Sequence, residues 1–256
     1  MKRLRLVLIS FLLITLMVGC SGKRVPAEAI DLTSHCQQVA DGLEELWNAY
    51  EYPEHFIKSG YKLQYPLEGD FDPNRYFEVL THLSLPEGKV LDYVYSMEGL
   101  GGVPILYVRG ENDPQATESP EFGVFFDLIQ LDGSLESYFE YAVFQEFSNT
   151  FYLFWHANYG YRVLTCGENA METIDGVINI FTKEYEYTPM ERDRMESANK
   201  AAWYIEKDGL AEVRFAYFTP FGGLMEQVYQ FEKGSTPQVA RKTTKVLVRF
   251  ETDLVY

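Results

Sequence analysis

The sequence predicts an α+β fold: a largely antiparallel sheet of about 8–10 strands, with an N-terminal amphipathic helix and a few short helices packed on it. Three observations lead to this prediction. Of the 256 residues, 46% are hydrophobic, which is enough for a packed core and excludes global disorder. Helical periodicity is limited to a few segments, whereas runs of aromatic and β-branched residues fill much of the remainder. Short turns join most of these runs, and this favours antiparallel pairing over a doubly wound sheet.

The first helix is predicted for residues 34–50. Ser34 and Gln37 have the Ser-x-x-Gln spacing of a capping box at its start. Apolar side chains then recur at the spacing of one helical face, which predicts that this face is buried. These residues are Cys36, Val39, Ala40, Leu43, Leu46, Trp47 and Tyr50. Tyr52-Pro53 ends the helix, because proline cannot continue it.

Three shorter helices are predicted further along the chain. One runs from Asp72-Pro73 to about Leu83, with aspartate as the N-cap and proline at the first helical position. Residues 168–177 form another short helix. A second capping box, Thr188 to Glu191, opens a helix towards Ala201.

Strands are predicted for most of the remaining chain. Their expected ranges are 90–97, 103–108, 138–147, 151–157, 161–166, 203–206, 211–218, 225–232 and 245–251. Asp208-Gly209 is a strong signal for a tight hairpin between two of them. Residues 122–129 fit a helix by spacing and a strand by aromatic content, so both alternatives stay open there.

The extreme N-terminus carries the clearest functional signal. Lys2, Arg3 and Arg5 form a basic start, residues 6–18 are apolar apart from one Ser and one Thr, and Gly19-Cys20 follows. This combination resembles a bacterial lipoprotein signal, which implies cleavage before Cys20 and attachment of lipid to it. Two acyl chains on that residue are enough for stable membrane anchoring. The alternatives are an ordinary secretory signal and an uncleaved anchor.

That resemblance implies a domain organisation: a signal peptide at 1–19, a lipidated cysteine and tether at 20–33, and a single extracytoplasmic domain at 34–256. The expected location is the bacterial cell envelope, anchored to the membrane but not crossing it. Residues 154–159 and 216–223 also loosely resemble segments of uncharacterised extracytoplasmic lipoproteins. The second resemblance implies no activity and no site residues.

The charge balance counts against a nucleic-acid partner, and we expect none, because phosphate binding needs basic patches. The chain has 22 basic and 38 acidic residues, a formal net charge of −16. Removal of residues 1–19 takes away three basic residues and no acidic ones, which leaves 19 basic against 38 acidic residues, or −19. An anionic body is repelled by an anionic bilayer, so the expected contact with the membrane is through the lipid.

The cysteine count fits an oxidising compartment. If Cys20 carries lipid, Cys36 and Cys166 remain as an even pair, and we predict a disulfide between them. The alternatives are two inert thiols or a catalytic thiol. No Cys-His signature surrounds Cys166.

Motifs for metals and cofactors are weak or absent, and we expect neither. Asp70, Asp72 and Asn74 have the spacing that starts a calcium loop. Arg75 stands where that loop needs glycine and Thr81 where it needs glutamate, which favours helix capping instead. No His-Glu-x-x-His motif, nucleophile elbow or phosphate loop occurs in the sequence. The histidines are scattered singly, at His35, His55, His82 and His156.

The candidate ligand site is Trp155, His156 and Tyr159, at the end of a predicted strand that runs into a turn. The alternative for His156 is a hydrogen bond to that turn. Aromatic residues make up 16% of the chain, and they suit either ligand binding or sheet packing.

Non-catalytic binding of an envelope ligand or protein partner is therefore the favoured function. A carboxylate-based envelope hydrolase is one alternative, because carboxylate separations are invisible in a sequence. A structural or assembly lipoprotein is the other.

Overall fold

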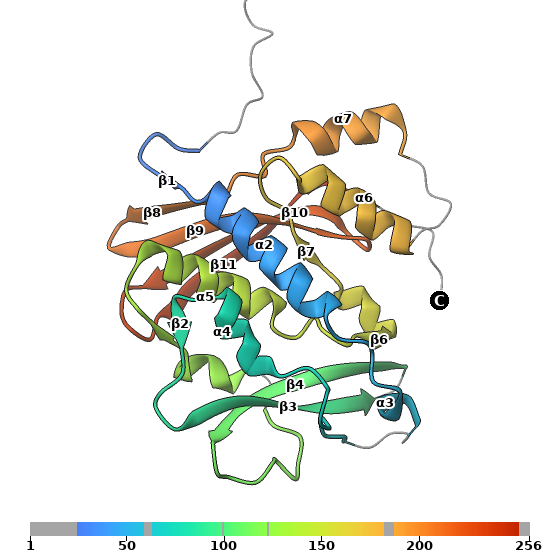
Figure 1. Cartoon of the computed structure of the whole chain (residues 1–256). Helices are drawn as coiled ribbons and strands as arrows, with labels where there is room; N and C mark the ends of the chain where they lie inside the picture. The colour runs from blue at the N-terminus through green and yellow to red at the C-terminus, as the bar shows by residue number, and fades with distance from the viewer. Residues whose placement is uncertain (1–24, 59–62, 99, 122, 182–186, 251–256) are drawn as a thin grey trace, which may run out of the picture.

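The computed structural model describes residues 25–58, 63–98, 100–121, 123–181 and 187–250 (Figure 1). It confirms the α+β fold, and every strand pairing in the described ranges is antiparallel. The strands are β1 (Ile30–Asp31), β2 (Leu83–Ser84), β3 (Lys89–Glu98), β4 (Gly101–Gly110), β5 (Gln130–Leu131), β6 (Phe154–Trp155), β7 (Val163–Leu164), β8 (Trp203–Lys207), β9 (Leu210–Thr219), β10 (Gly223–Glu232) and β11 (Gln238–Val248). The helices are α2 (Thr33–Asn48), α3 (Glu54–Lys58), α4 (Tyr76–Val79), α5 (Leu135–Phe147), α6 (Ala170–Phe181) and α7 (Pro189–Ser197), with single 3-10 turns η1 (Pro73–Arg75), η2 (Val124–Leu128) and η3 (His156–Gly160).

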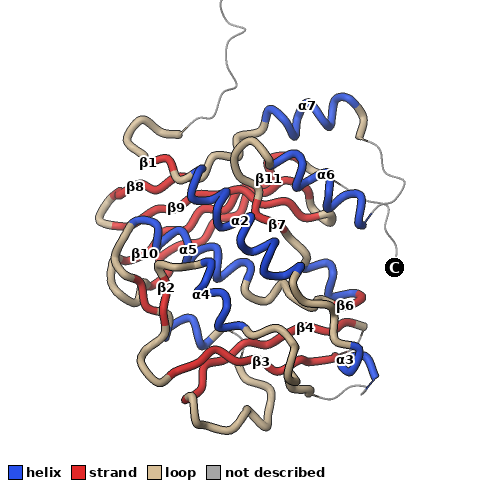
Figure 2. The backbone as a smooth tube through the Cα atoms, in the orientation of Figure 1, coloured by secondary structure: helices blue, strands red, loops and turns tan. Residues whose placement is uncertain are grey.

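The strands form three sheets of unequal size. The largest has the order β1-β8-β9-β10-β11, with β7 added beside β9. A second sheet joins β6 to the long hairpin β3-β4, and a third pairs β2 with β5. Helices α2 and α5 lie between the large sheet and the β3-β4 hairpin, whereas α6 and α7 lie at the opposite end of the molecule (Figures 1 and 2).

Strand β9 joins two parts of the core because its side chains alternate between two faces. Val213 and Phe215 belong to the main core, which they share with α2, α5 and the β3-β4 hairpin. Ala216 and Phe218 belong to a smaller core under α6 and α7. The sheet is therefore covered on both faces near the end of β9.

Helix α2 confirms the predicted amphipathic helix, but the predicted capping box is wrong. The helix begins at Thr33, and its N-cap, Leu32, makes no side-chain cap. Instead, the Thr33 N–H donates to Oδ1 of Asp31 at 2.8 Å. Asp31 is held for this role because β1 pairs with β8, so an ordered strand precedes the helix. The segment predicted as tether therefore joins the sheet at its last residues.

Residues 138–147 form most of helix α5, so the predicted strand there is wrong. Ten of its 13 residues are buried. A helix that is buried on most of its surface shows no clear amphipathic period, and its aromatic content then resembles that of a strand. Ser134 starts the helix, accepting a hydrogen bond from the Ser137 N–H at 3.2 Å.

Several other elements differ in extent from the predictions: the strand predicted at 245–251 is β11 and begins at Gln238, and the segment 122–129, left open between helix and strand, contains η2. The predicted helix at 72–83 is reduced to η1 and α4, followed by β2. Asp72 caps η1 by accepting from the Asn74 N–H at 2.9 Å, as the capping interpretation predicts. The strands predicted at 151–157 and 161–166 shrink to β6 and β7, with η3 between them. The capping box at Thr188 and the hairpin through Asp208-Gly209 are confirmed.

Cys36 and Cys166 form the predicted disulfide, with their Cα atoms 5.8 Å apart. The bond joins α2 to the chain two residues after the end of β7. A disulfide fits a non-cytoplasmic compartment. Among the described residues, no helix has the length and apolar character needed to span a bilayer. Cys20 and the rest of residues 1–24 lie outside the described residues.

Candidate functional site

A cavity of about 650 Å³ lies between α2, α6 and the segment that connects α5 to β7. This volume is within the range of small-molecule sites. The disulfide lies in the same region of the fold, because it joins α2 to Cys166 just after β7, and residues of both α2 and β7 line the cavity. The aromatic residues of the cavity lining are Trp47, Tyr50, Tyr52, Phe71, Phe151, Tyr152, Tyr161 and Phe181.

The cavity combines these apolar walls with acidic side chains. Asp41 and Glu44 on α2 and Glu172 on α6 contribute to the lining, and all three are exposed. No Lys, Arg or His of the described ranges contributes to it. The charge of the cavity is therefore negative, and its aromatic faces add attraction for a cation.

Hydrogen bonds to Tyr95 and Tyr76, which lie outside the lining, hold the aromatic walls in place. The Tyr52 hydroxyl donates to the Tyr95 hydroxyl at 2.8 Å, and the Tyr95 hydroxyl donates to the Tyr152 carbonyl at 2.9 Å. Trp47 Nε1 donates to the Tyr76 hydroxyl at 3.1 Å. Burial raises the pKa of Tyr152 to about 12, so this wall is uncharged at neutral pH. The cavity is thus preformed.

The connecting segment has a strained backbone beside the cavity. Tyr152 and Trp155 have φ angles of 51° and 50°, a region that bulky residues rarely adopt, at a cost of about 1–3 kcal/mol each. Strand β6 holds Trp155 opposite Gly101. A Cβ atom on Gly101 would lie 2.8 Å from the Ala157 backbone nitrogen, so only glycine allows this approach. Strain of this kind is concentrated at functional sites.

The predicted ligand residues lie next to the cavity and do not line it. Trp155 and Tyr159 are each 47% exposed, and His156 lies between them on η3. A series of ring contacts nevertheless leads inward from Tyr159 to Phe221 (4.7 Å between ring centroids), Phe181 (5.8 Å) and the cavity residue Tyr161 (4.8 Å). The predicted residues therefore form an outer aromatic surface that continues into the cavity.

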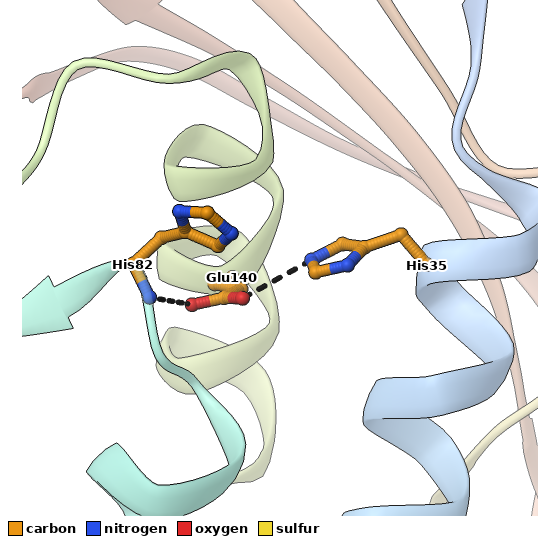
Figure 3. A group of neighbouring side chains, drawn as sticks. All are labelled: His35, His82 and Glu140. Carbon is orange, nitrogen blue, oxygen red and sulfur yellow. Dashed lines mark hydrogen bonds and ion pairs between the residues drawn. The ribbon is translucent and has the colours of Figure 1, made fainter.

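A second group consists of two histidines and one glutamate that are far apart in the sequence but close together in the fold. His35 on α2, His82 before β2 and Glu140 on α5 each place one potential ligand atom within 4.8 Å of the others (Figure 3). Glu140 is fully buried. Its Oε2 accepts from the His82 backbone N–H at 2.8 Å, and its Oε1 lies 3.1 Å from Nε2 of His35.

Asp132 orients the His82 ring from outside this group. Its Oδ2 lies 2.7 Å from Nδ1 of His82, and its Oδ1 accepts hydrogen bonds from the N–H and the hydroxyl of Ser134. Partial burial acts to raise the pKa of Asp132, but the bonds from Ser134 and His82 outweigh it and lower the pKa to about 2. For His82, partial burial acts to lower the pKa, and the Asp132 bond with the charge of Glu140 raises it overall.

Sequence reasoning missed this group for two reasons. Its members come from three elements, so no local spacing marks them. Glu140 was also assigned to a strand, where its relation to α2 could not be foreseen. A usable signal was present: Glu140 stands between aromatic residues in a largely apolar segment, and a buried carboxylate needs partners.

Comparison of the chain with protein-family models, with curated proteins and with solved structures gives no match.

Proposed function

We propose that this chain is a lipid-anchored protein of the bacterial cell envelope that binds a small cationic ligand with an apolar body in the cavity between α2 and α6. Binding is its function, and no chemical step is part of the proposal. The N-terminal resemblance to a lipoprotein signal supports the anchor, and the Cys36–Cys166 disulfide fits the compartment.

The observation that carries the ligand class is the composition of the cavity lining. Eight aromatic residues and three carboxylates contribute to it, without a basic side chain from the described residues. An aromatic face attracts a cation, and desolvation between two rings strengthens that attraction. Asp41, Glu44 and Glu172 would attract the same charge. An anionic ligand would meet repulsion from all three.

The experiment compares three probes of one shape and different charge. These are 2-naphthylmethylammonium, neutral 2-naphthylmethanol and anionic 2-naphthoate, each titrated calorimetrically into the full chain in detergent. The expected order of affinity is cation, then neutral compound, then anion. Equal affinities, or no saturable binding of any probe, would contradict the proposed ligand class.

A variant without these charges tests whether the three carboxylates of the lining determine the order of probe affinities. Asp41→Asn, Glu44→Gln and Glu172→Gln together keep the shape of the lining and remove its negative charge. Because each exposed pair contributes about 0.2–1 kcal/mol, we expect about tenfold weaker binding of the cation and little change for the neutral probe. An unchanged preference for the cation would show that these carboxylates do not determine the charge selectivity.

A further inference from the structure

We propose that His35, His82 and Glu140 form a zinc-binding site at the junction of α2, β2 and α5. This inference is independent of the ligand cavity, whose lining contains none of the three residues. Two imidazoles and one carboxylate are ligands that Zn²⁺ prefers in proteins, and three protein ligands leave a fourth position for water.

The ligand atoms are close to the spacing of a zinc site. Bonds of about 2.0–2.2 Å in tetrahedral geometry place ligand atoms about 3.5 Å apart. His35 Nε2 and Glu140 Oε1 are already 3.1 Å apart. All three ligand atoms lie within 4.8 Å of one another, so closure needs a movement of about 1 Å. The imidazoles have room to move, because the side chains of His35 and His82 are 20% and 31% exposed.

The second observation is that two of the ligand atoms lack a hydrogen bond. His35 Nε2 and Glu140 Oε1 lie within ion-pair distance, yet their mutual orientation gives no hydrogen bond, and neither atom has another hydrogen-bond partner within the described ranges. Glu140 is fully buried, and an unsatisfied buried carboxylate oxygen is costly. A cation between the two rings and this oxygen would satisfy it. In Figure 3 a ring nitrogen of His35 points at the Glu140 carboxylate, and the His82 ring lies beside the same carboxylate.

The third observation is the outer contact of His82. Metal-binding histidines donate their second ring N–H to a carboxylate, which fixes the tautomer and the ring orientation. Asp132 holds Nδ1 of His82 in this way at 2.7 Å, which leaves Nε2 as the ligand atom. Ser134 in turn holds Asp132. The group therefore combines the oriented ring of His82 with a Glu140 oxygen that lacks a hydrogen bond.

The test uses the full chain, without an affinity tag, stripped of metal with a chelator in detergent. Zn²⁺ is titrated calorimetrically, and Co²⁺ is added as a spectroscopic probe of tetrahedral N/O ligation. We expect one saturable Zn²⁺ site per chain, an increase in melting temperature with Zn²⁺, and intense visible absorption with Co²⁺. Absence of saturable Zn²⁺ binding would overturn the proposal and leave Glu140 as a buried partner of His35.

The variants separate ligation from folding. Asp132→Asn removes only the outer partner, and we expect it to weaken Zn²⁺ binding about 10–100-fold. His82→Gln removes a partly exposed ligand and should weaken binding further. Glu140→Gln changes a buried carboxylate, so its folding must be checked by circular dichroism. His55→Gln is the matched control, because His55 also lies near a carboxylate, Asp70 at 3.5 Å, but outside the group.

The outcomes of the variant series are distinct. Loss of the site in His82→Gln with wild-type affinity in His55→Gln supports the proposal. Wild-type affinity in both would overturn it, because the bound metal would then lie elsewhere.

Discussion

Cys36 and Cys166 are 130 residues apart in the sequence, and the disulfide between them places their Cα atoms 5.8 Å apart. Cys36 lies on the buried face of α2, and Cys166 follows β7. The bond therefore closes a loop that contains α5, the β3-β4 hairpin and the connecting segment beside the cavity. It fixes one wall of the cavity relative to another.

Removal of this bond should destabilise the whole fold. On the chain-entropy account, closure of a loop of this length contributes about 5 kcal/mol, with 2–4 kcal/mol typical of measured cases. For the Cys36→Ala/Cys166→Ala variant we expect a free energy of unfolding lower by about 2–5 kcal/mol in urea denaturation. A midpoint equal to that of the oxidised wild type would show that the bond contributes nothing to stability.

The anchor is tested by intact mass of the chain purified from its host's membranes. We expect a mass that begins at Cys20 with added lipid, and two alkylatable thiols that appear only after reduction. A mass that begins elsewhere without lipid would contradict the anchor.

Buried tyrosines should make the protein sensitive to alkali. Burial raises the pKa of Tyr76, Tyr93, Tyr95 and Tyr229 above 10, and that of Tyr152 to about 12. In the unfolded chain these groups lose their protons near pH 10, whereas the folded state keeps them neutral. The unfolded state then binds fewer protons, so stability falls as pH rises above 10. Urea denaturation at pH 9, 10 and 11 measures the decline, and a flat profile would contradict it.

The outer aromatic surface should matter less for ligand binding than the cavity wall. Trp47 lines the cavity, whereas His156 and Tyr159 lie outside it. For Trp47→Ala we expect at least about tenfold weaker binding of 2-naphthylmethylammonium. His156→Ala and Tyr159→Ala should change it less than threefold (roughly 0.6 kcal/mol). The reverse order would place the site at η3, as the sequence analysis predicted.

The hairpin β8-β9 and the capping box of α7 could be predicted from sequence because local chemistry decides them. Asp208 and Gly209 both adopt positive φ, at 54° and 80°, which few residue pairs allow. Thr188 and Glu191 satisfy each other's backbone N–H groups without help from the rest of the fold. Elements of this kind can be predicted because residues close together in the sequence determine their conformation.

Helix α5 and the cap of α2 could not be predicted, because tertiary contacts decide them. Burial on all sides removes the period of α5. Asp31 replaces the expected Ser34 cap because β1 is held by β8. The same reason hides both sites: the cavity and the His35, His82 and Glu140 group are each assembled from elements distant in sequence.

A larger side chain inside the cavity tests whether the ligand binds between α2 and α6. Gly176 on α6 lines the cavity, and a Cβ atom there meets no other atom within 4 Å. Gly176→Leu extends a larger apolar side chain from this open position, and Gly176→Ala is its control, since both variants improve helix propensity by up to about 1 kcal/mol. Calorimetric titration with 2-naphthylmethylammonium should show wild-type affinity in the alanine variant and lost binding in the leucine variant, with both melting at or above the wild-type temperature. Equal binding by a folded leucine variant would show that the ligand does not enter this cavity.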